Sequence, residues 1–288
     1  MLRKPSWLTK ALPDPEALRR IRGLLGDLQL HTICESGNCP NLGECWAQAT
    51  ATFLILGNVC TRNCAFCDVD SGHPDVLDPC EPAHVAQAVE ALDLSHVVVT
   101  SVSRDDLADG GAEQFAATIR EIRRVCPETA IEVLIPDFMG DLECLATVLN
   151  AQPTILGHNI ETVQSLHRRI RPRFDYEVSL ELLAASKRLS SHIYTKSSVM
   201  VGLGETEADV LATLRDLREV DCDFVTVGQY LQPSRHHLPV KEYVHPHVFE
   251  AYRSEAEAMG FKYVASGPFV RSSYNAAEAL RVGRRATD

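Results

Sequence analysis

Six of the ten cysteines lie within a 34-residue stretch, in two groups of three. The first group is spaced C-x4-C-x5-C and the second C-x3-C-x2-C; their members are Cys34, Cys39 and Cys45, then Cys60, Cys64 and Cys67. A structural zinc site takes four ligands, whereas three thiolates on one short loop suit three corners of a [4Fe–4S] cluster. The second group therefore favours a cluster whose fourth iron is open to another ligand, with zinc binding as the alternative.

The first group also lacks a fourth ligand, and its spacing does not name one. Glycine, asparagine and proline between its cysteines supply the turns that a chain needs to wrap around a cluster. The remaining cysteines are scattered in helix-like sequence, and we interpret them as packing residues because a free cysteine behaves as a small hydrophobe. They are Cys80, Cys126, Cys144 and Cys222.

Seven apolar, β-rich runs are separated by segments of helical periodicity. Near-continuous apolar runs are typical of strands buried on both faces, and strand–helix alternation predicts a parallel sheet. We expect an α/β fold, a partial (β/α)6 barrel of the TIM type, because the repeat number falls short of eight. The expected strands are 52–57, 96–102, 130–135, 154–160, 194–204, 224–231 and 262–269, and two of the helices are 82–93 and 205–220.

This layout predicts where the chemistry lies. The second cysteine group follows the first expected strand, and barrels carry their active sites at the carboxyl ends of the strands. Polar clusters follow the later strands at the same end: "TSVSRDD" (100–106), "HNIET" (158–162), "GLGET" (202–206), "QYLQPS" (229–234) and "RSSY" (271–274).

Charge and hydropathy exclude several classes of protein. A net charge of −11 argues against a broad nucleic-acid-binding surface. No apolar run reaches the ~20 residues that span a bilayer, and the first residues lack the apolar core of a secretory signal. We therefore expect a cytoplasmic protein with no membrane or nucleic-acid partner. The basic run "HRRIRPR" (167–173) is either a solvated helix end or an anchor for an anionic group.

Two histidine pairs invite a zinc interpretation. His236 and His237 are adjacent, and His245 and His247 flank a proline. Neither pair has cysteine or carboxylate partners at ligand spacing, so we interpret both as parts of proline-rich turns.

The cysteine triplets together with "RSSY" resemble the lipoyl synthase family of the radical S-adenosylmethionine superfamily. The resemblance covers essentially the whole chain. It departs at Ser103, where the family usually has an acid or amide, and at His158, where "GHN" replaces the more usual "NHN". Further matching stretches are "KPSWL" (4–8), "VTSVSRDDLADGGA" (99–112), "GHNIETV" (157–163), "TKSSVMVGLGET" (195–206), "GQYLQPSRHHLPV" (228–240) and "ASGPFVRSSY" (265–274).

The resemblance implies a sulfurtransferase with two [4Fe–4S] clusters. One cluster binds S-adenosylmethionine and cleaves it to a 5′-deoxyadenosyl radical. The other, auxiliary cluster donates two sulfur atoms to C6 and C8 of a protein-bound octanoyl-lysine. The implied partners are octanoylated lipoyl carrier domains (2-oxoacid dehydrogenase E2 subunits and the glycine cleavage H protein), an electron donor such as flavodoxin or ferredoxin, and a cluster-repair carrier.

The resemblance also assigns residues. Cys60, Cys64 and Cys67 would hold the radical cluster. Cys34, Cys39 and Cys45 would hold the auxiliary cluster, with Ser273 as its fourth ligand and Ser272 as the alternative. Arg271 and Tyr274 would support substrate or cluster. The implied S-adenosylmethionine contacts are Phe66, Thr100, Ser101, Asn159, Glu161, Arg173 and Lys196.

The same resemblance suggests three regions. Residues 1–50 form an extension with the auxiliary cysteines, 51–265 form the barrel, and 266–288 form a segment that closes the auxiliary site. Two other functions compete with this one: a different sulfur-inserting enzyme similar to biotin synthase, and a non-catalytic iron–sulfur or zinc scaffold.

Overall fold

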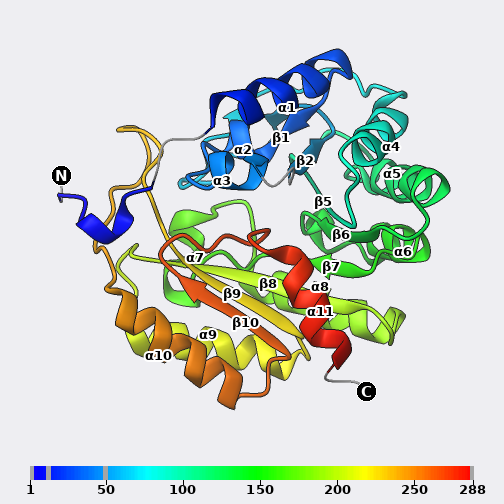
Figure 1. Cartoon of the computed structure of the whole chain (residues 1–288). Helices are drawn as coiled ribbons and strands as arrows, with labels where there is room; N and C mark the ends of the chain where they lie inside the picture. The colour runs from blue at the N-terminus through cyan, green and yellow to red at the C-terminus, as the bar shows by residue number, and fades with distance from the viewer. Residues whose placement is uncertain (1–2, 11–13, 48–50, 286–288) are drawn as a thin grey trace. The chain divides into compact units, whose positions relative to one another are not determined.

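The computed structural model describes residues 3–10, 14–47 and 51–285, which form two compact units (Figure 1). Unit 1 comprises Met1–Thr9, Asn63–Cys67 and Gly157–Asp288. Unit 2 comprises Lys10–Arg62 and Asp68–Leu156. The second cysteine group is therefore shared: Cys60 belongs to unit 2, and the other two cysteines belong to unit 1.

Unit 2 contains a sheet in the order β1-β2-β5-β6-β7. Strand β2 pairs in parallel with β5, and β5 with β6, while the two-residue β1 pairs antiparallel with β2. The strands are β1 (His31–Thr32), β2 (Thr52–Ile55), β5 (His96–Ser101), β6 (Ala130–Leu134) and β7 (Ile155–Gly157). A separate short parallel pair is β3 (Val59–Cys60) with β4 (Asp70–Ser71).

The helices of unit 2 follow the strands in the order expected of βα repeats. Helix α4 lies between β2 and β5 in sequence, α5 between β5 and β6, and α6 between β6 and β7. The elements are α1 (Pro15–Asp27), α2 (Ile33–Ser36), α3 (Leu42–Ala47), α4 (Glu81–Ala91), α5 (Ala112–Val125), the 3-10 helix η2 (Phe138–Gly140) and α6 (Leu142–Asn150).

Unit 1 continues the alternation with the parallel strands β8-β9-β10. Both internal registers are regular, with Met200 opposite Gly228 and Gly228 opposite Gly267. The elements are η1 (Ser6–Leu8), α7 (Gln164–Ile170), α8 (Tyr176–Leu189), β8 (Tyr194–Val201), α9 (Glu207–Glu219), β9 (Phe224–Gln229), α10 (Pro246–Ala258), β10 (Tyr263–Gly267) and α11 (Ala276–Arg285).

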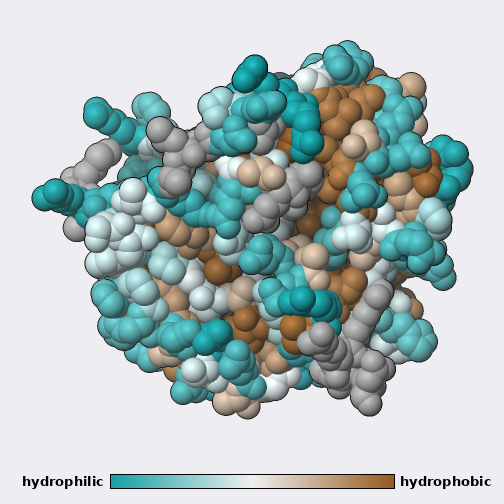
Figure 2. All heavy atoms as spheres, viewed as in Figure 1, coloured by the Kyte–Doolittle hydropathy of each residue, from teal (hydrophilic) through white to brown (hydrophobic). Residues whose placement is uncertain are grey.

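Several helices begin with a side-chain cap, among them α1, α6, α8 and α9. Thr206 and Asp209 make a reciprocal capping box at the start of α9. In α10, Phe249, Tyr252 and Ala256 are buried at helical spacing, and the outward surface is mainly hydrophilic (Figure 2). Within the described residues, no helix is long and apolar enough to cross a membrane.

The seven expected strands are all present, each within the range predicted for it. Among the four cysteines interpreted as packing residues, Cys144 and Cys222 are buried and Cys126 is half-buried. For Cys80 that interpretation was wrong: it is exposed because it is the residue before the first turn of α4, outside the helix's apolar face. The expected boundary at residue 50 lies outside the described residues, and the three-region division remains a prediction.

Candidate functional site

The first cysteine group is folded by two short helices of unit 2. Cys34 lies in α2, and Cys45 lies in α3. The backbone N–H of Cys39 donates to the carbonyl of Cys34 at 3.0 Å, and that of Cys45 donates to Asn41 at 2.9 Å. Turns closed by these hydrogen bonds keep the three thiols in one small region.

The three thiols are close enough to influence each other's ionisation. Burial and, to a smaller extent, the neighbouring Cys39 raise the pKa of Cys34 to about 11. Burial also raises the pKa of Cys45 to about 12, with added repulsion from Cys34 and Cys39. Three sulfurs that repel one another as anions are a donor set that a cationic iron–sulfur centre would stabilise.

Trp46 lies beside this group and is fully buried. Its Nε1–H has no acceptor in hydrogen-bonding geometry among the described residues. It is nonetheless near enough to the Cys34 sulfur to favour the thiolate. A buried N–H donor that faces a thiolate fits a site for a sulfur-ligated cluster.

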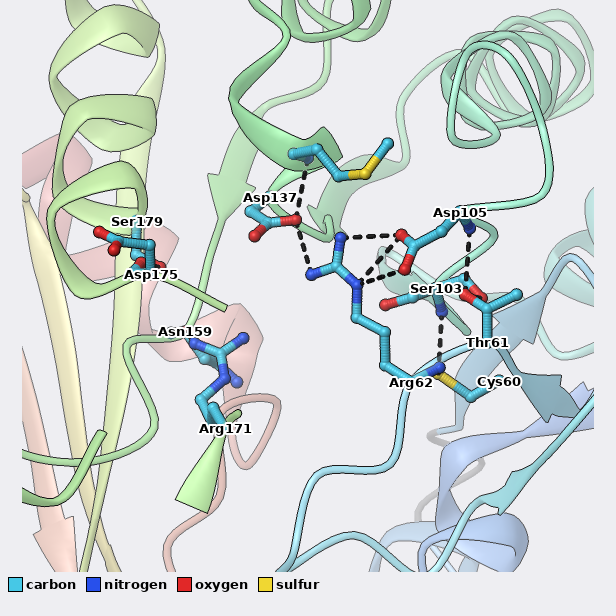
Figure 3. A network of polar contacts seen from close by, with 11 residues as sticks. Cys60, Thr61, Arg62, Ser103, Asp105, Asp137, Asn159, Arg171, Asp175 and Ser179 are labelled. Atoms are coloured by element: carbon cyan, nitrogen blue, oxygen red, sulfur yellow. Dashed lines mark hydrogen bonds and ion pairs between the residues drawn. The ribbon is translucent and has the colours of Figure 1, made fainter. Parts of the chain in front are cut away.

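Cys60 ends the short strand β3, and its sulfur accepts two backbone hydrogen bonds. The N–H of Arg62 donates at 3.4 Å and that of Ser103 at 3.3 Å. Thr61 joins the same two segments, since its N–H and its hydroxyl both donate to the Ser103 carbonyl, at 3.0 and 2.9 Å. The departure at Ser103 therefore leaves these contacts intact, because only its backbone takes part in them (Figure 3).

Cys64 and Cys67 lie on a tight turn in unit 1, in which the Cys67 N–H donates to the Cys64 carbonyl at 3.1 Å. His237 Nε2 lies 2.9 Å from the Cys67 carbonyl, and its Nδ1 lies 2.9 Å from the Ser234 hydroxyl. Because a carbonyl only accepts, Nε2 carries the proton in this arrangement. His237 thus stabilises the Cys64–Cys67 turn by a hydrogen bond, a role that the sequence did not predict.

The neighbouring residues of this turn are also held within unit 1. Ala65 N–H donates to the Ile170 carbonyl at 2.9 Å, and the Ala65 carbonyl accepts from Leu238 at 3.2 Å. Phe66 packs against an apolar group formed by Ile170, Leu203 and Tyr230. One side of the Phe66 ring, which is expected to contact the cofactor, is therefore held by packing against unit 1.

Asn159 and Glu161, both among the implied S-adenosylmethionine contacts, lie together in unit 1. The Asn159 amide donates to the Glu161 carboxylate at 3.0 Å. Burial raises the pKa of Glu161, while the positive charges of Arg171 and Arg271 and the amide of Asn159 oppose that rise. The Glu161 backbone has a left-handed φ of 66°, a conformation that is uncommon for residues other than glycine and is found at functional sites.

Arg171, which sequence reasoning missed, is buried beside this pair. Its guanidinium donates to the Asn159 carbonyl at 2.8 Å and lies 3.7 Å from the centre of the Phe174 ring. Arg173, the residue expected to contact the cofactor, is exposed. The signal that could have found Arg171 is its place directly after α7, where an arginine can bind nearby carbonyls.

The other expected cofactor residues are distributed between the units. Lys196 is buried on β8 in unit 1. In unit 2, the Thr100 hydroxyl donates to the Leu134 carbonyl at 3.0 Å, which occupies its proton. The Ser101 hydroxyl is buried and has no partner within the described part of the chain, so it is a polar group that a ligand could satisfy.

The "RSSY" turn directly precedes α11 in unit 1. Ser272 and Ser273 are half-buried, and the Tyr274 N–H donates to the Arg271 carbonyl at 3.0 Å. Gly228 on β9 lies against this turn: a Cβ placed there would be 2.1 Å from the Val270 carbonyl oxygen. The turn is thus seated on a strand position that only glycine fits.

No three His, Cys, Asp or Glu side chains among the described residues are arranged to hold a single metal ion. A [4Fe–4S] cluster differs from a single ion, because each cysteine binds a different iron and the sulfurs need not converge on one point. The histidine pairs are explained otherwise, since His237 braces the cysteine turn and His245 caps α10 by accepting from the His247 N–H.

Comparison with known proteins identifies the class of this site. The model of the radical SAM superfamily matches residues 54–217, more than half of the chain. The chain therefore belongs to the radical S-adenosylmethionine superfamily, which confirms the expected cofactor and iron–sulfur chemistry.

Full-length relatives narrow the class to one family. A lipoyl synthase of Caldicellulosiruptor saccharolyticus is 52% identical over 97% of this chain and 98% of its own length. One of Caldanaerobacter subterraneus is 53% identical over 98% and 99%, and one of Myxococcus xanthus is 52% identical over 98% and 95%. Within the superfamily, the chain belongs to the lipoyl synthases.

Solved structures support the fold. Methylornithine synthase aligns with a TM-score of 0.57 at 14% identity, covering 96% of this chain and 77% of the other. The hydrogenase maturase HydG aligns with a TM-score of 0.52 at 13% identity, covering 86% and 70%. Together with the parallel strand order, they confirm the expected partial barrel of the radical S-adenosylmethionine kind.

Proposed function

We propose that this chain makes the lipoyl group by inserting two sulfur atoms at C6 and C8 of an octanoyl chain attached to a protein lysine. The observation that carries the proposal is the 52–53% identity to lipoyl synthases over nearly the whole of both chains. The two separate cysteine triplets support it, because a reaction that both cleaves S-adenosylmethionine and supplies sulfur needs two clusters with different tasks.

In this proposal, Cys60, Cys64 and Cys67 hold the cluster that binds S-adenosylmethionine. That cluster supplies reductive cleavage of the sulfonium when bound. The chain's own residues then orient the cofactor: Asn159 and Glu161 present an amide and a carboxylate to its polar groups. Phe66 packs beside its adenine, and Lys196, Thr100, Ser101 and Arg173 complete the proposed contacts. The added contact is Arg171, whose charge lies beside Glu161.

Cys34, Cys39 and Cys45 hold the auxiliary cluster in this proposal, with Ser273, or Ser272, as its fourth ligand. A serine oxygen is a harder donor than a thiolate and matches iron–sulfur chemistry less well. The iron bound by serine should therefore be the first to leave when sulfur is withdrawn. Arg271 and Tyr274 hold the serine turn in shape.

The partners follow from the substrate. We propose octanoylated lipoyl carrier domains, such as 2-oxoacid dehydrogenase E2 subunits and the glycine cleavage H protein, as acceptors of the sulfur. A flavodoxin or ferredoxin would supply electrons, and a cluster carrier would rebuild the auxiliary cluster. All of these would act in the cytoplasm.

Anaerobic reconstitution tests the two-cluster site directly. Two [4Fe–4S] clusters predict about eight iron and eight sulfide per chain. Cys39→Ala should lose about half of both, whereas Cys126→Ala, a half-buried cysteine outside both triplets, should lose none. About four iron in the unmodified chain would contradict the proposal, and one or two zinc ions instead of iron would favour a non-catalytic scaffold.

A further inference from the structure

Arg62 lies inside the second cysteine group, between Cys60 and Cys64, and its side chain is 2% exposed. Its guanidinium binds two carboxylates of unit 2 at once. Nε donates to both Asp105 oxygens at 3.0 and 2.8 Å, and one terminal nitrogen donates to Asp105 at 2.8 Å. The other terminal nitrogen lies 2.8 Å from Asp137 (Figure 3).

The two carboxylates come from neighbouring parallel strands. Asp105 follows β5, Asp137 follows β6, and these strands pair in register. Asp137 is itself fixed, because its side chain accepts the Met139 N–H at 3.1 Å at the start of η2. The Arg62 guanidinium therefore connects the segment that carries Cys60 to the residues that follow β5 and β6.

The same segments that the Arg62 ion pairs connect also surround the Cys60 sulfur. The sulfur accepts the N–H of Arg62 itself and that of Ser103, two residues before Asp105. The Asp105 N–H in turn donates to the Thr61 hydroxyl at 3.0 Å. Hydrogen bonds thus join segment 60–62 to segment 103–105 along their length. The ion pair between Arg62 and Asp105 adds a side-chain contact between the last residues of the two segments.

The ion pairs are suited to this task by their geometry. Burial alone lowers the pKa of Arg62, but the hydrogen bonds and charges of Asp105 and Asp137 more than reverse that effect. A planar guanidinium can engage two carboxylates in fixed directions, whereas a lysine ammonium presents a point charge on a flexible stem. Hydrogen bonds to the sulfurs of an iron–sulfur cluster tune its reduction potential.

We propose that Arg62 is a positioning residue that, through Asp105 and Asp137, holds Cys60 where two backbone N–H groups donate to its sulfur and so sets the reduction potential of the cluster bound there. The proposal rests on the proposed cluster at Cys60, Cys64 and Cys67. It does not depend on the identity of the substrate that is sulfurated.

The test uses the reconstituted full-length chain and compares Arg62→Lys with the unmodified protein. The measurement is a potentiometric titration of the electron paramagnetic resonance signal that changes on addition of S-adenosylmethionine. This criterion separates the cluster in question from the auxiliary one. We expect the variant to keep its iron content but to have a more negative midpoint potential. We also expect S-adenosylmethionine cleavage to slow at least tenfold at a fixed potential of the reductant.

Two further variants keep the result interpretable. Asp105→Asn keeps Arg62 but removes the charge of its ion-pair partner. This variant should shift the midpoint potential in the same direction by a smaller amount. Arg123→Gln is the matched control, because Arg123 donates to the carbonyls of Pro127, Thr129 and Gln152 at the other end of the strands. It should lower thermal stability without moving the potential.

Each outcome decides between the two proposals. An unchanged potential in Arg62→Lys, or an equal shift in Arg123→Gln, overturns the positioning role of Arg62 and leaves the proposed function standing. If the unmodified chain gives no signal that responds to S-adenosylmethionine, the proposed cluster itself fails.

Discussion

Gly228 offers a way to disturb the serine turn without changing any proposed ligand. One Cα hydrogen of Gly228 faces the turn, so Gly228→Ala would place a methyl group 2.1 Å from the Val270 carbonyl oxygen and 3.4 Å from an Arg271 terminal nitrogen. The first distance is far below contact, and the second is an ordinary contact. The collision is therefore with the backbone that leads into Ser272 and Ser273.

The structure sets the size of the effect. The Val270 carbonyl must retreat by about 1 Å to reach ordinary van der Waals separation, and Gly228 cannot move away because β9 is paired on both sides. Overpacking of this kind costs about 1–3 kcal/mol, and for a chain of this size the midpoint of thermal unfolding should fall by about 2–10 °C. A misplacement of about 1 Å in a reacting group can cost about a hundredfold in rate, so displacement of the serine turn should lower sulfur insertion about tenfold or more.

The assay measures two products in one anaerobic reaction with an octanoyl-lysine peptide. In Gly228→Ala, we expect the thiolated peptide to fall much further than 5′-deoxyadenosine. The matched control is Gly267→Ala on the adjacent strand, where an added methyl meets only the Val270 side chain at 3.4 Å; this variant should keep the normal product ratio. A normal ratio and normal stability in Gly228→Ala would refute the seating of the turn on this strand.

Three further predictions separate the remaining parts of the site. Cys60→Ala should abolish 5′-deoxyadenosine formation, whereas Cys34→Ala should retain it and lose sulfur insertion; loss of both activities in Cys34→Ala would argue against separate roles for the clusters. Arg171→Met should raise the KM for S-adenosylmethionine more than Arg173→Met, because only the first lies buried beside the proposed cofactor carboxylate and amide; equal effects would contradict this placement. Burial alone would raise the pKa of Asp223, but two lysines and a backbone N–H lower it. Because hydrogen bonds to a charged group contribute about 1.5–3 kcal/mol, Asp223→Asn should cost about 2–3 kcal/mol in urea unfolding at pH 7. Because its pKa is lowered in the folded state, the Asp223 carboxylate stabilises the fold at pH values above its unfolded-state pKa of about 4. The difference in unfolding free energy between Asp223→Asn and the unmodified chain should therefore shrink as the pH falls below 4. A difference that grew on acidification would contradict the lowered pKa of Asp223.

The sheet could be predicted from the sequence because its strands are buried on both faces. Strand β9, for example, is buried at every residue from Phe224 to Gln229, and such a strand must be nearly continuous in apolar or small residues. Strand β1 could not be predicted, because two residues such as His31 and Thr32 carry no periodicity. Its formation depends on backbone pairing with β2, which composition does not encode.

The cysteines were visible in the sequence because their types and spacing carry the chemistry. The residues that brace them were not. His237 reaches the cysteine turn across 170 positions of sequence, and Ser103 acts through its backbone, so its side chain gives no signal. Arg171 and Arg173 belong to one basic run, and only folding distinguishes the buried one from the exposed one.

One measurement tests the central claim most directly. The reconstituted chain is mixed anaerobically with S-adenosylmethionine, a reductant and an octanoyl-lysine peptide, and the peptide is examined by mass spectrometry. The proposed function predicts a peptide that has gained two sulfur atoms, with two molecules of 5′-deoxyadenosine formed for each. Formation of 5′-deoxyadenosine without any singly or doubly thiolated peptide would contradict it.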